Sequence, residues 1–367
     1  MLKKSYDVAV VFGGVSGENE VSVITGTMAC NVLKKGGRTV LPVYIDHAGV
    51  IRADEELSDI TVYKNGGYEK YPECGFAVGS VVPFGKGGKP KRAVKVGALL
   101  NCCHGGAGEG GGISGLCAVL GIPFASAGLF ESAAFMDKNY TKLVLQSLGV
   151  KTAKFIYSRD IKGAIEGAEA LGYPVIVKPV TLGSSIGIAK CEDSEELERA
   201  LETAFELDSG VLCERYLYPR REINCAAYFS DGKVITSPCE EVTSAGEVLS
   251  YDDKYCGGGS RLFPAPLDED VAAGIRKETA RVYTALNMRG IVRFDYILSG
   301  GDMYISEINT VPGSLSQYLL SEGYVDFYKV LDGVIRQAEA DFAAGKTKRI
   351  ISTGILNDIS AVKSMKK

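Results

Sequence analysis

The sequence predicts a multidomain protein that combines an α/β unit with α+β units. Its 367 residues are too many for one ordinary core and suffice for about two or three domains. In residues 1–130, apolar runs alternate with helical or glycine-rich segments, which is typical of a parallel sheet covered by helices. Beyond them, short strands and helices follow in the order strand, helix, strand. An N-terminal α/β domain should therefore precede smaller α+β units.

In the N-terminal domain we expect strands at 8–12, 41–45 and 98–102 and a helix at 21–34. The charged start of the chain resembles a secretion signal, but the apolar run after it is short and leads directly into glycines. We therefore interpret that run as a core strand. The basic, glycine-rich segment 85–92 is expected to be a solvated loop.

A helix at 137–148 should open the central domain, which we place at residues 131–218. Its other strands and helices are expected at 155–157, 160–171, 174–178, 186–190, 194–207 and 211–214. A C-terminal domain at 219–345 mixes strands, a long loop and two helices, and residues 346–367 form a C-terminal appendage.

The composition, 46% hydrophobic and 23% charged, is that of an ordinary globular protein. A net charge of -4 without a dense Lys/Arg cluster argues against nucleic acid as a partner. No run approaches the ~18 to 20 apolar residues that a membrane helix needs, so we expect a cytoplasmic protein that binds no membrane. The ten scattered cysteines lack the paired spacing of a zinc site and are expected to be buried, reduced thiols.

A strand that ends at Lys178 is followed by a loop with Gly183, Ser184, Ser185 and Gly187. Glycines let backbone N–H groups converge on phosphate oxygens, and the lysine adds a positive charge directed at the same group. The pattern favours a nucleotide-phosphate site, although an ordinary glycine hairpin has the same composition.

A second constellation lies on two consecutive strands near the C-terminus. Arg293 and Asp295 share one face of the first strand, and Glu307 and Asn309 share one face of the second. If a three-residue loop at 300–302 joins the strands, Asp295 lies opposite Glu307 and Arg293 opposite Asn309. A slip of one residue would separate the two pairs.

In that register two carboxylates and an amide oxygen converge, a donor set that suits Mg²⁺ completed by substrate phosphates. Arg293 would then face a transferring phosphate or a developing oxyanion. Backbone N–H groups of residues 311–314 could bind a carboxylate as a nest. A surface hairpin with cross-strand charge pairs is the alternative.

Two other nucleotide motifs fit less well. Residues 106–111 form a literal G-x-G-x-x-G, but the motif follows a late strand, and the next acidic candidate, Glu131, lies in a helix-like stretch. A nicotinamide-dependent oxidoreductase is therefore disfavoured. No P-loop sequence occurs in the chain.

Several of these motifs, in this order, resemble those of the D-alanine:D-alanine ligases of the ATP-grasp superfamily. The matching segments are an opening motif at 12–22, a His-Gly loop at 104–109, a nucleotide lysine motif at 136–138, the phosphate loop at 177–185, a mobile loop at 251–255 and a metal-binding signature at 307–313. The resemblance implies an ATP-grasp fold with the nucleotide between the last two domains. It also implies ligation of two D-alanine molecules through an acyl phosphate, for synthesis of a peptidoglycan precursor, by a homodimer.

The resemblance also assigns roles to residues. It implies catalytic roles for Glu18, Ser184, Tyr255 and Arg293, and contacts to ATP from Lys138, Lys178, Ser185, Glu214, Glu222 and Lys254. It implies Mg²⁺ or Mn²⁺ ligands at Asp295, Glu307 and Asn309, and substrate contacts from Glu18, His104, Arg293, Gly313 and Tyr318. Glu18 would hold the ammonium group of the first D-alanine.

The sequence departs from the family pattern at a few positions. Gly110 replaces an aspartate and Ser114 a glutamine in the His-Gly loop, and Tyr318 replaces a serine that contacts the second substrate. The spacing from Glu214 to Glu222 is one residue longer than in the family. A ligase that makes another dipeptide, such as one ending in D-serine, and a degraded regulatory ATP-binding protein therefore stay as alternatives. The mobile loop resembles that of amide-forming ligases, so an amine nucleophile is expected.

Overall fold

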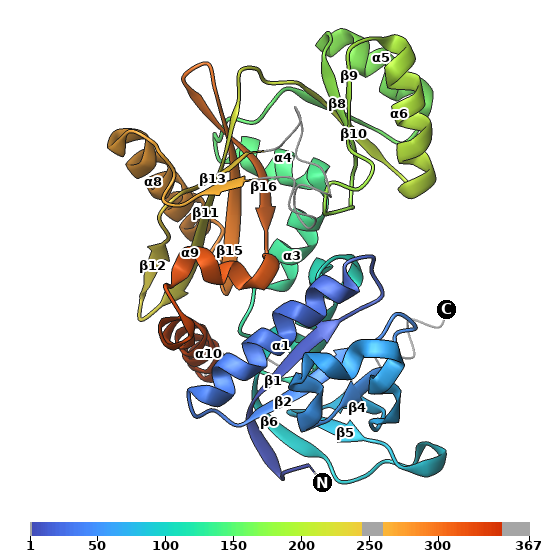
Figure 1. The fold of residues 1–367 in the computed structure, drawn as a ribbon, viewed down its shortest axis with the longest axis vertical. Coiled ribbons are helices and arrows are strands. Elements are labelled where there is room, and N and C mark those ends of the chain that lie inside the picture. The colour runs from blue at the N-terminus through green and yellow to red at the C-terminus, as the bar shows by residue number, and fades with distance from the viewer. Residues whose placement is uncertain (1, 244–259, 347–367) are drawn as a thin grey trace, which may run out of the picture.

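The computed structural model describes residues 2–243 and 260–346, which form three sheets with their helices (Figure 1). The first sheet has the strand order β3-β2-β1-β6-β5-β4. Its strands are β1 (Ser5–Gly13), β2 (Val40–Ile45), β3 (Ile51–Ala53), β4 (Cys74–Ala77), β5 (Ser80–Pro83) and β6 (Val94–Asn101). The helices of this region are α1 (Asn19–Lys35) and α2 (Ile113–Leu120), with short helices at Glu55–Ser58, Ile60–Lys70, Lys86–Gly88 and Gly108–Gly112.

The first sheet is mixed, whereas the sequence predicted a parallel one. The central strands β2, β1 and β6 are parallel, but β3, β5 and β4 pair in the antiparallel direction. The reason is the length of the connections, because a tight turn such as Val78-Gly79 between β4 and β5 can join only antiparallel strands. The segment 85–92 follows β5 as an exposed loop, as predicted.

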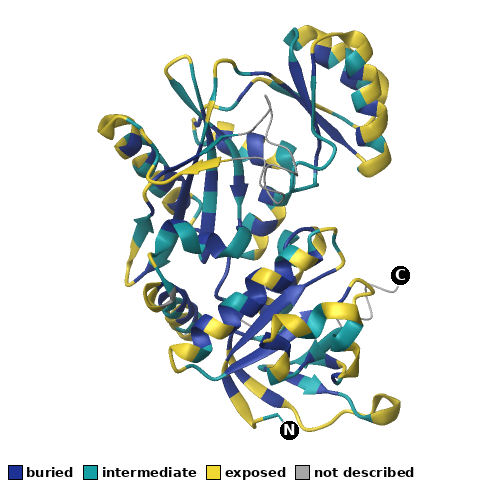
Figure 2. Ribbon diagram, in the orientation of Figure 1, coloured by how far each residue is buried: buried dark blue, intermediate teal, exposed yellow. Residues whose placement is uncertain are grey.

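The second sheet is small and antiparallel, with the order β7-β10-β8-β9. Its strands are β7 (Phe155–Ser158), β8 (Val175–Pro179), β9 (Ala189–Cys191) and β10 (Val211–Arg215), and α5 (Ile161–Leu171) and α6 (Ser194–Leu207) pack on it. The outer faces of both helices are exposed (Figure 2). The strand expected at 186–190 begins only at Ala189, because Ser184, Ser185 and Gly187 have positive φ and cannot continue a strand.

The third sheet has the order β14-β13-β11-β15-β16, with β12 paired to β11. Its strands are β11 (Arg221–Ser230), β12 (Lys233–Thr236), β13 (Glu240–Thr243), β14 (Ser260–Leu262), β15 (Ile291–Ser299) and β16 (Asp302–Asn309). The associated helices are α3 (Leu129–Met136), α4 (Lys138–Ser147), α8 (Glu269–Ala285), a short helix at Gly313–Ser316 and α9 (Gln317–Leu320).

Two sets of helices pack in domains other than those the sequence suggested. The helix expected at 137–148 corresponds to α4 and was placed in the central domain, but its Leu145 belongs to the core of the third sheet. Helix α3, for which no bounds were predicted, contributes Phe135 to the same core. Helix α10 (Tyr324–Lys346) returns to the first domain, where Phe327 and Leu331 pack with residues of β1 and α1. A helical pattern shows which face is apolar but does not show which sheet covers that face.

The described cysteines are all buried and reduced, as predicted. In the part of the chain that the structure describes, no helix combines the length and apolar character needed to cross a bilayer. Residues 347–367 of the proposed appendage lie outside the described residues.

The contact between α1 and β1 depends on a glycine. A Cβ atom at Gly26 would lie 2.2 Å from Cγ of Phe12, a residue that is itself completely buried. We predict that Gly26→Ala destabilises the protein by at least ~2 kcal/mol, because overpacking exceeds the gain in helix propensity. Urea denaturation measures the change.

Gly274 in α8 is the matched control, because a Cβ atom there meets nothing within 4 Å. Gly274→Ala should stabilise the protein by ~0.5 to 1 kcal/mol, the gain expected for alanine in a helix. Equal effects of the two substitutions would contradict the close packing of α1 on Phe12.

Candidate active site

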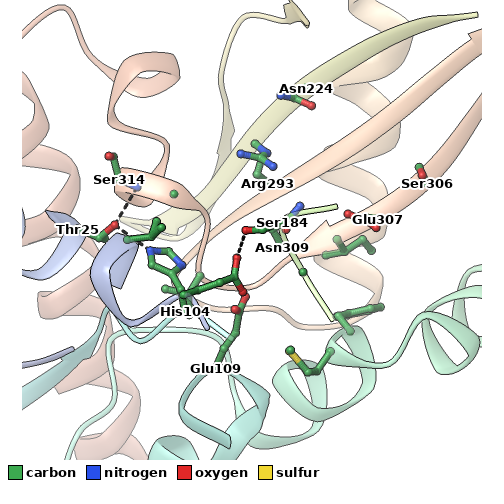
Figure 3. A pocket seen from close by; sticks show the side chains of 18 of the residues that line it. Thr25, His104, Glu109, Ser184, Asn224, Arg293, Ser306, Glu307, Asn309 and Ser314 are labelled. Atoms are coloured by element: carbon green, nitrogen blue, oxygen red, sulfur yellow. Dashed lines mark hydrogen bonds between the residues drawn. The ribbon is translucent and has the colours of Figure 1, made fainter. Parts of the chain in front are cut away.

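A cavity of about 390 Å³ lies where the three sheets approach one another. Figure 3 shows side chains from α1, the loop after β6, the phosphate loop and the hairpin β15–β16 directed toward it. The predicted site residues that line it are Glu18, His104, Lys138, Ser184, Arg293, Glu307, Asn309, Gly313 and Tyr318. The fold thus brings together predicted site residues that are up to 300 positions apart in the sequence.

A second cavity of about 110 Å³ adjoins the first and shares Gly183, Ser184, Arg293 and Glu307 with it. The predicted site residues found in its lining are Lys178, Ser184, Ser185, Glu214, Glu222, Arg293, Asp295 and Glu307. Lys254 and Tyr255, the two residues expected on the mobile loop, lie outside the described residues.

The hairpin β15–β16 has the predicted register. Asp295 pairs with Glu307, and Arg293 pairs with Asn309. The predicted three-residue loop is wrong, however, because Ser299 pairs with Asp302 across a two-residue turn. Its two residues, Gly300 and Gly301, have φ of 58° and 83°, as a type I′ turn requires. A bulge then restores the register, since Tyr296 pairs with Ile305 and Ser306 is the extra residue.

Arg293 is the centre of a hydrogen-bonded group on this hairpin. Its guanidinium donates to both carboxylate oxygens of Asp295, at 2.7 and 2.9 Å, and to the hydroxyl of Tyr318 at 3.2 Å. Asn309 Nδ2 also donates to Asp295, at 2.9 Å. Burial alone would lower the pKa of Arg293, but Asp295 and Tyr318 outweigh it and raise that pKa, so the group stays charged.

The donor set on this hairpin is compatible with a hard cation. Among residues 2–243 and 260–346 there is no cluster of three His, Cys, Asp or Glu side chains suited to a metal. Asp295 and Glu307 are directly opposite each other, and Asn309 uses its amide nitrogen toward Asp295, which leaves its oxygen as the potential ligand. Oxygen ligands of this kind are those that Mg²⁺ takes when phosphates complete its shell.

Glu18 and Ser184 connect the first domain to the phosphate loop. The Ser184 hydroxyl donates a short hydrogen bond to Oε1 of Glu18. A Cβ atom at Gly183 would lie 2.8 Å from Oε2 of Glu18, so a larger residue there would displace this carboxylate. Two of the residues that the resemblance makes catalytic, Glu18 and Ser184, are therefore in contact.

His104 is buried and forms a relay with Thr25, which the sequence analysis did not assign, and with Ser314 of the predicted nest. Its Nε2 lies 2.8 Å from the hydroxyl of Thr25, which accepts a hydrogen bond from the Ser314 backbone N–H at 3.1 Å (Figure 3). Burial lowers the pKa of His104 to about 4, so the imidazole is neutral. Because the Ser314 N–H is used within the protein, the nest predicted at 311–314 is smaller than expected.

Glu109 is a second unassigned residue of the site. It accepts a hydrogen bond from the Gly105 N–H at 2.7 Å, and burial, with Glu18 nearby, raises its pKa to about 7. The Ser16 hydroxyl donates to the His104 carbonyl at 2.6 Å, which fixes the same loop from the other side. The loop is thus anchored despite the departures at 110 and 114. Glu109 was visible within the His-Gly motif, whereas Thr25 has no motif signal.

The lysines of the nucleotide side are held by specific partners. Lys138 Nζ donates to the Leu182 carbonyl at 2.5 Å and lies 3.9 Å from Glu307. Lys178 Nζ donates to Glu214 at 3.0 Å. Glu222 forms a short ion pair with Arg220.

Comparison with known proteins agrees with this geometry. The family model described as D-ala D-ala ligase N-terminus matches residues 7–127, and the model described as D-ala D-ala ligase C-terminus matches residues 144–333. The chain belongs to the D-alanine–D-alanine ligase family. A ligase of this family from Thermosipho africanus is 32% identical over 356 residues, with 93% of this chain and 95% of the relative covered. D-alanine–D-alanine ligase B from Clostridium tetani is 33% identical over 322 residues, covering 85% and 87% of the two chains.

Solved structures of the ligase family have the same fold. The D-alanine–D-alanine ligase from Helicobacter pylori superposes with a TM-score of 0.74 at 25% identity, covering 90% of this chain and 98% of that one. The VanG D-Ala:D-Ser ligase from Enterococcus faecalis superposes with a TM-score of 0.78 at 25% identity, covering 91% and 100%. The predicted ATP-grasp fold is confirmed.

Variants at His104 and Glu109 should change the pH dependence of stability in opposite directions. The pKa of His104 is about 4 in the folded chain and 6.5 ordinarily, so stability is lost as the pH falls through this window. The pKa of Glu109 is about 7 against 4.5, so its contribution is lost as the pH rises. His104→Gln should remove a loss of ~2 to 3 kcal/mol in the free energy of unfolding that the wild type shows as the pH falls. Glu109→Gln should remove a smaller loss that the wild type shows as the pH rises toward neutrality, because this side chain is partly exposed.

Urea unfolding of the wild type and both variants, in steps from about pH 4 to pH 7.5, measures these slopes. His47 is not among the residues that line either cavity, so His47→Gln is the control substitution. A wild-type and a His104→Gln curve that run parallel over this range would contradict the neutral, buried state of His104.

Proposed function

We propose that this protein is an ATP-dependent ligase that joins two D-alanine molecules through an acyl phosphate. The supporting observation is the register of β15 and β16, which sets Asp295, Glu307 and Asn309 beside Arg293. The same cavity contains the Glu18–Ser184 contact, and the adjoining one contains Lys178. This arrangement provides the groups for phosphoryl transfer to a carboxylate.

In the proposed reaction, a carboxylate oxygen of the first D-alanine attacks the γ-phosphorus of ATP, and ADP leaves. The amine of the second D-alanine then attacks the acyl carbon, loses a proton and expels phosphate. Mg²⁺ held by Asp295, Glu307 and Asn309 would neutralise and align the triphosphate. Glu18 binds the first ammonium group, and Arg293 stabilises the tetrahedral oxyanion, a contribution of ~3 to 4 kcal/mol in comparable sites.

Tyr318 is proposed to shape the site of the second substrate. Its hydroxyl accepts from Arg293, and the guanidinium carbon of Arg261 lies 5.0 Å from the centre of its ring. These two contacts fix the Tyr318 ring, which reduces the room beside Gly313 and favours a small second substrate such as D-alanine. D-serine is the second candidate, because a D-Ala:D-Ser ligase is among the similar structures.

We further propose that the enzyme acts as a homodimer in the cytoplasm, in peptidoglycan precursor synthesis. Membership of the ligase family supports these three proposals. Light scattering of the purified protein tests the dimer.

Phosphate release and product analysis test the function. The wild type, given ATP, Mg²⁺ and an equimolar mixture of D-alanine, D-serine and D-lactate at pH 7 and pH 9, should form D-alanyl-D-alanine as the main product. Dominance of the D-serine product would establish the alternative ligase, and a D-lactate ester would exclude the amide assignment. Nucleotide binding without any turnover would indicate a regulatory protein.

Asp295→Asn and Glu307→Gln should each abolish turnover while the protein stays folded. Neutral amides cannot balance the charge of Mg²⁺ bound to a triphosphate. Steady-state phosphate release, with circular dichroism to verify folding, measures this. Asp302→Asn, which alters an exposed carboxylate at the far end of the same hairpin, is the control and should retain activity. Near-normal rates in both site variants would remove the metal assignment.

Tyr318→Ser should widen the range of second substrates. Removing the ring enlarges the space beside Arg293, and the serine hydroxyl keeps a polar group there, so the ratio of D-serine to D-alanine product should rise about 10-fold or more. Competition experiments with both amino acids measure the ratio. The control Tyr318→Phe keeps the ring and should leave the ratio near that of the wild type. A ratio unchanged in Tyr318→Ser would show that the ring does not select the partner.

A further inference from the structure

Lys142 is a buried lysine for which neither the sequence motifs nor the proposed mechanism has a role. It lies on α4, one helical turn after Lys138, and its side chain is 1% exposed. Lys142 is not among the residues that line the two cavities. A buried ammonium group is costly unless it is paired, so its partner determines what it does.

That partner is Glu214 on β10. Lys142 Nζ lies 2.8 Å from Oε1 of Glu214, and Lys178 Nζ lies 3.0 Å from Oε2. One carboxylate is therefore shared by two lysines that approach it from different elements, α4 and β8. Although burial on its own would raise the pKa of Glu214, Lys142 and Lys178 together lower it to about 2, so the carboxylate is ionised.

The charge balance of this cluster is uneven. Two ammonium groups and one carboxylate give a net charge of one positive unit when all three are ionised. Burial lowers the pKa of Lys142, and the adjacent Glu214 opposes that shift. Without Lys142, the buried pair of Lys178 and Glu214 would be neutral, and the full attraction of the carboxylate would act on Lys178 alone.

Lys178 is the member of the cluster with a direct path to a ligand. It lines the second cavity next to Ser184 and Ser185 of the phosphate loop, whereas Lys142 is behind Glu214. A positive charge that is not cancelled locally attracts a polyphosphate strongly in such a dry environment.

We propose that Lys142 is a positioning residue which, by sharing Glu214, keeps the charge of Lys178 available to the phosphates of the bound nucleotide. The inference rests on the proposed function, since it takes ATP as the ligand. It differs from a purely structural role, in which Lys142 would only fasten α4 to the central sheet. A structural role would lower stability and all ligand affinities together.

The test uses the full-length chain with Lys142→Met, Glu214→Gln and the double substitution. Calorimetry gives the affinity for ATP with Mg²⁺, inhibition gives the affinity for adenosine, and steady-state kinetics gives KM for D-alanine. Lys142→Met should weaken ATP binding by ~10-fold or more and change the other two constants by less than about 3-fold, because only phosphates sense the lost charge. Lys162→Met, an exposed lysine on α5, controls for the loss of one positive charge.

The double variant separates the two explanations. Because Glu214 is itself expected to contact ATP, the double variant is judged by the ratio of its affinities for ATP and adenosine, in which a lost contact to the nucleoside cancels. Removing the Glu214 charge as well restores one net positive charge, so this ratio should return to within about 3-fold of the wild type. The inference is overturned if Lys142→Met binds ATP normally, if it weakens adenosine equally, or if the ratio in the double variant is no higher than in Lys142→Met. Should Lys142→Met not fold, the double variant decides alone, and a ratio more than about 10-fold below that of the wild type overturns the inference. A wild type without ATP-dependent ligation would instead refute the proposed function.

Discussion

The pairing of β15 with β16 is the constraint on which the chemistry of this site depends. Side chains alternate between the two faces of a strand, so a shift of one residue would send Glu307 and Asn309 to the opposite face, away from Asp295 and Arg293. The two-residue glycine turn by itself produces that wrong pairing, because it aligns Ser299 with Asp302. The extra residue Ser306 corrects it. The bulge is therefore part of the site, since it alone reconciles the tight turn with the opposed carboxylates.

Around this hairpin, the site is completed by contacts between domains. Glu18 at the start of α1 meets Ser184 on the phosphate loop, and Thr25 on the same helix meets Ser314 beyond β16. The loop that follows α1 is in turn tied to α10, since Arg38 in that loop lies 2.7 Å from Asp332 and 3.3 Å from Glu339. One helix of the first domain thus contacts both neighbouring units, so its placement on β1 controls the geometry of the substrate cavity.

The local parts of this arrangement could be predicted from the sequence. The period of two along each strand put Arg293 and Asp295 on one face and Glu307 and Asn309 on one face, and the glycine and serine residues after Lys178 predicted a loop there. The pairing of Asp295 with Glu307 was reached through a three-residue loop that is wrong, and it holds because the bulge at Ser306 offsets the shorter turn. The turn length was mispredicted because a bulge has no clear sequence signal when the inserted residue is a serine. The roles carried over from the family, such as those of Glu222 and Lys254, remain predictions.

The parts that could not be predicted depend on contacts between distant segments. Thr25 and Lys142 look like ordinary polar positions of amphipathic helices, and their functions appear only when His104 and Glu214 are brought beside them. The same limit explains why α4 was expected in the central domain although it packs on the third sheet. Helix periodicity encodes a buried face, and the identity of the surface that covers it is a property of the tertiary fold.

The electrostatic design of the two halves of the site is different, and the difference follows from burial. At the proposed amino-acid site, His104 is kept neutral next to Arg293, which avoids a second positive charge beside the guanidinium proposed to stabilise an oxyanion. On the nucleotide side, buried charges are retained, and Lys142 and Lys178 outnumber the carboxylate between them. A neutral His104 leaves the guanidinium of Arg293 and the carboxylate of Glu18 to serve the two ends of a substrate that carries both charges at once. Surplus positive charge suits a triphosphate. Arg293 and Asp295 lie at the boundary of these two environments, where the phosphoryl group would pass from one to the other.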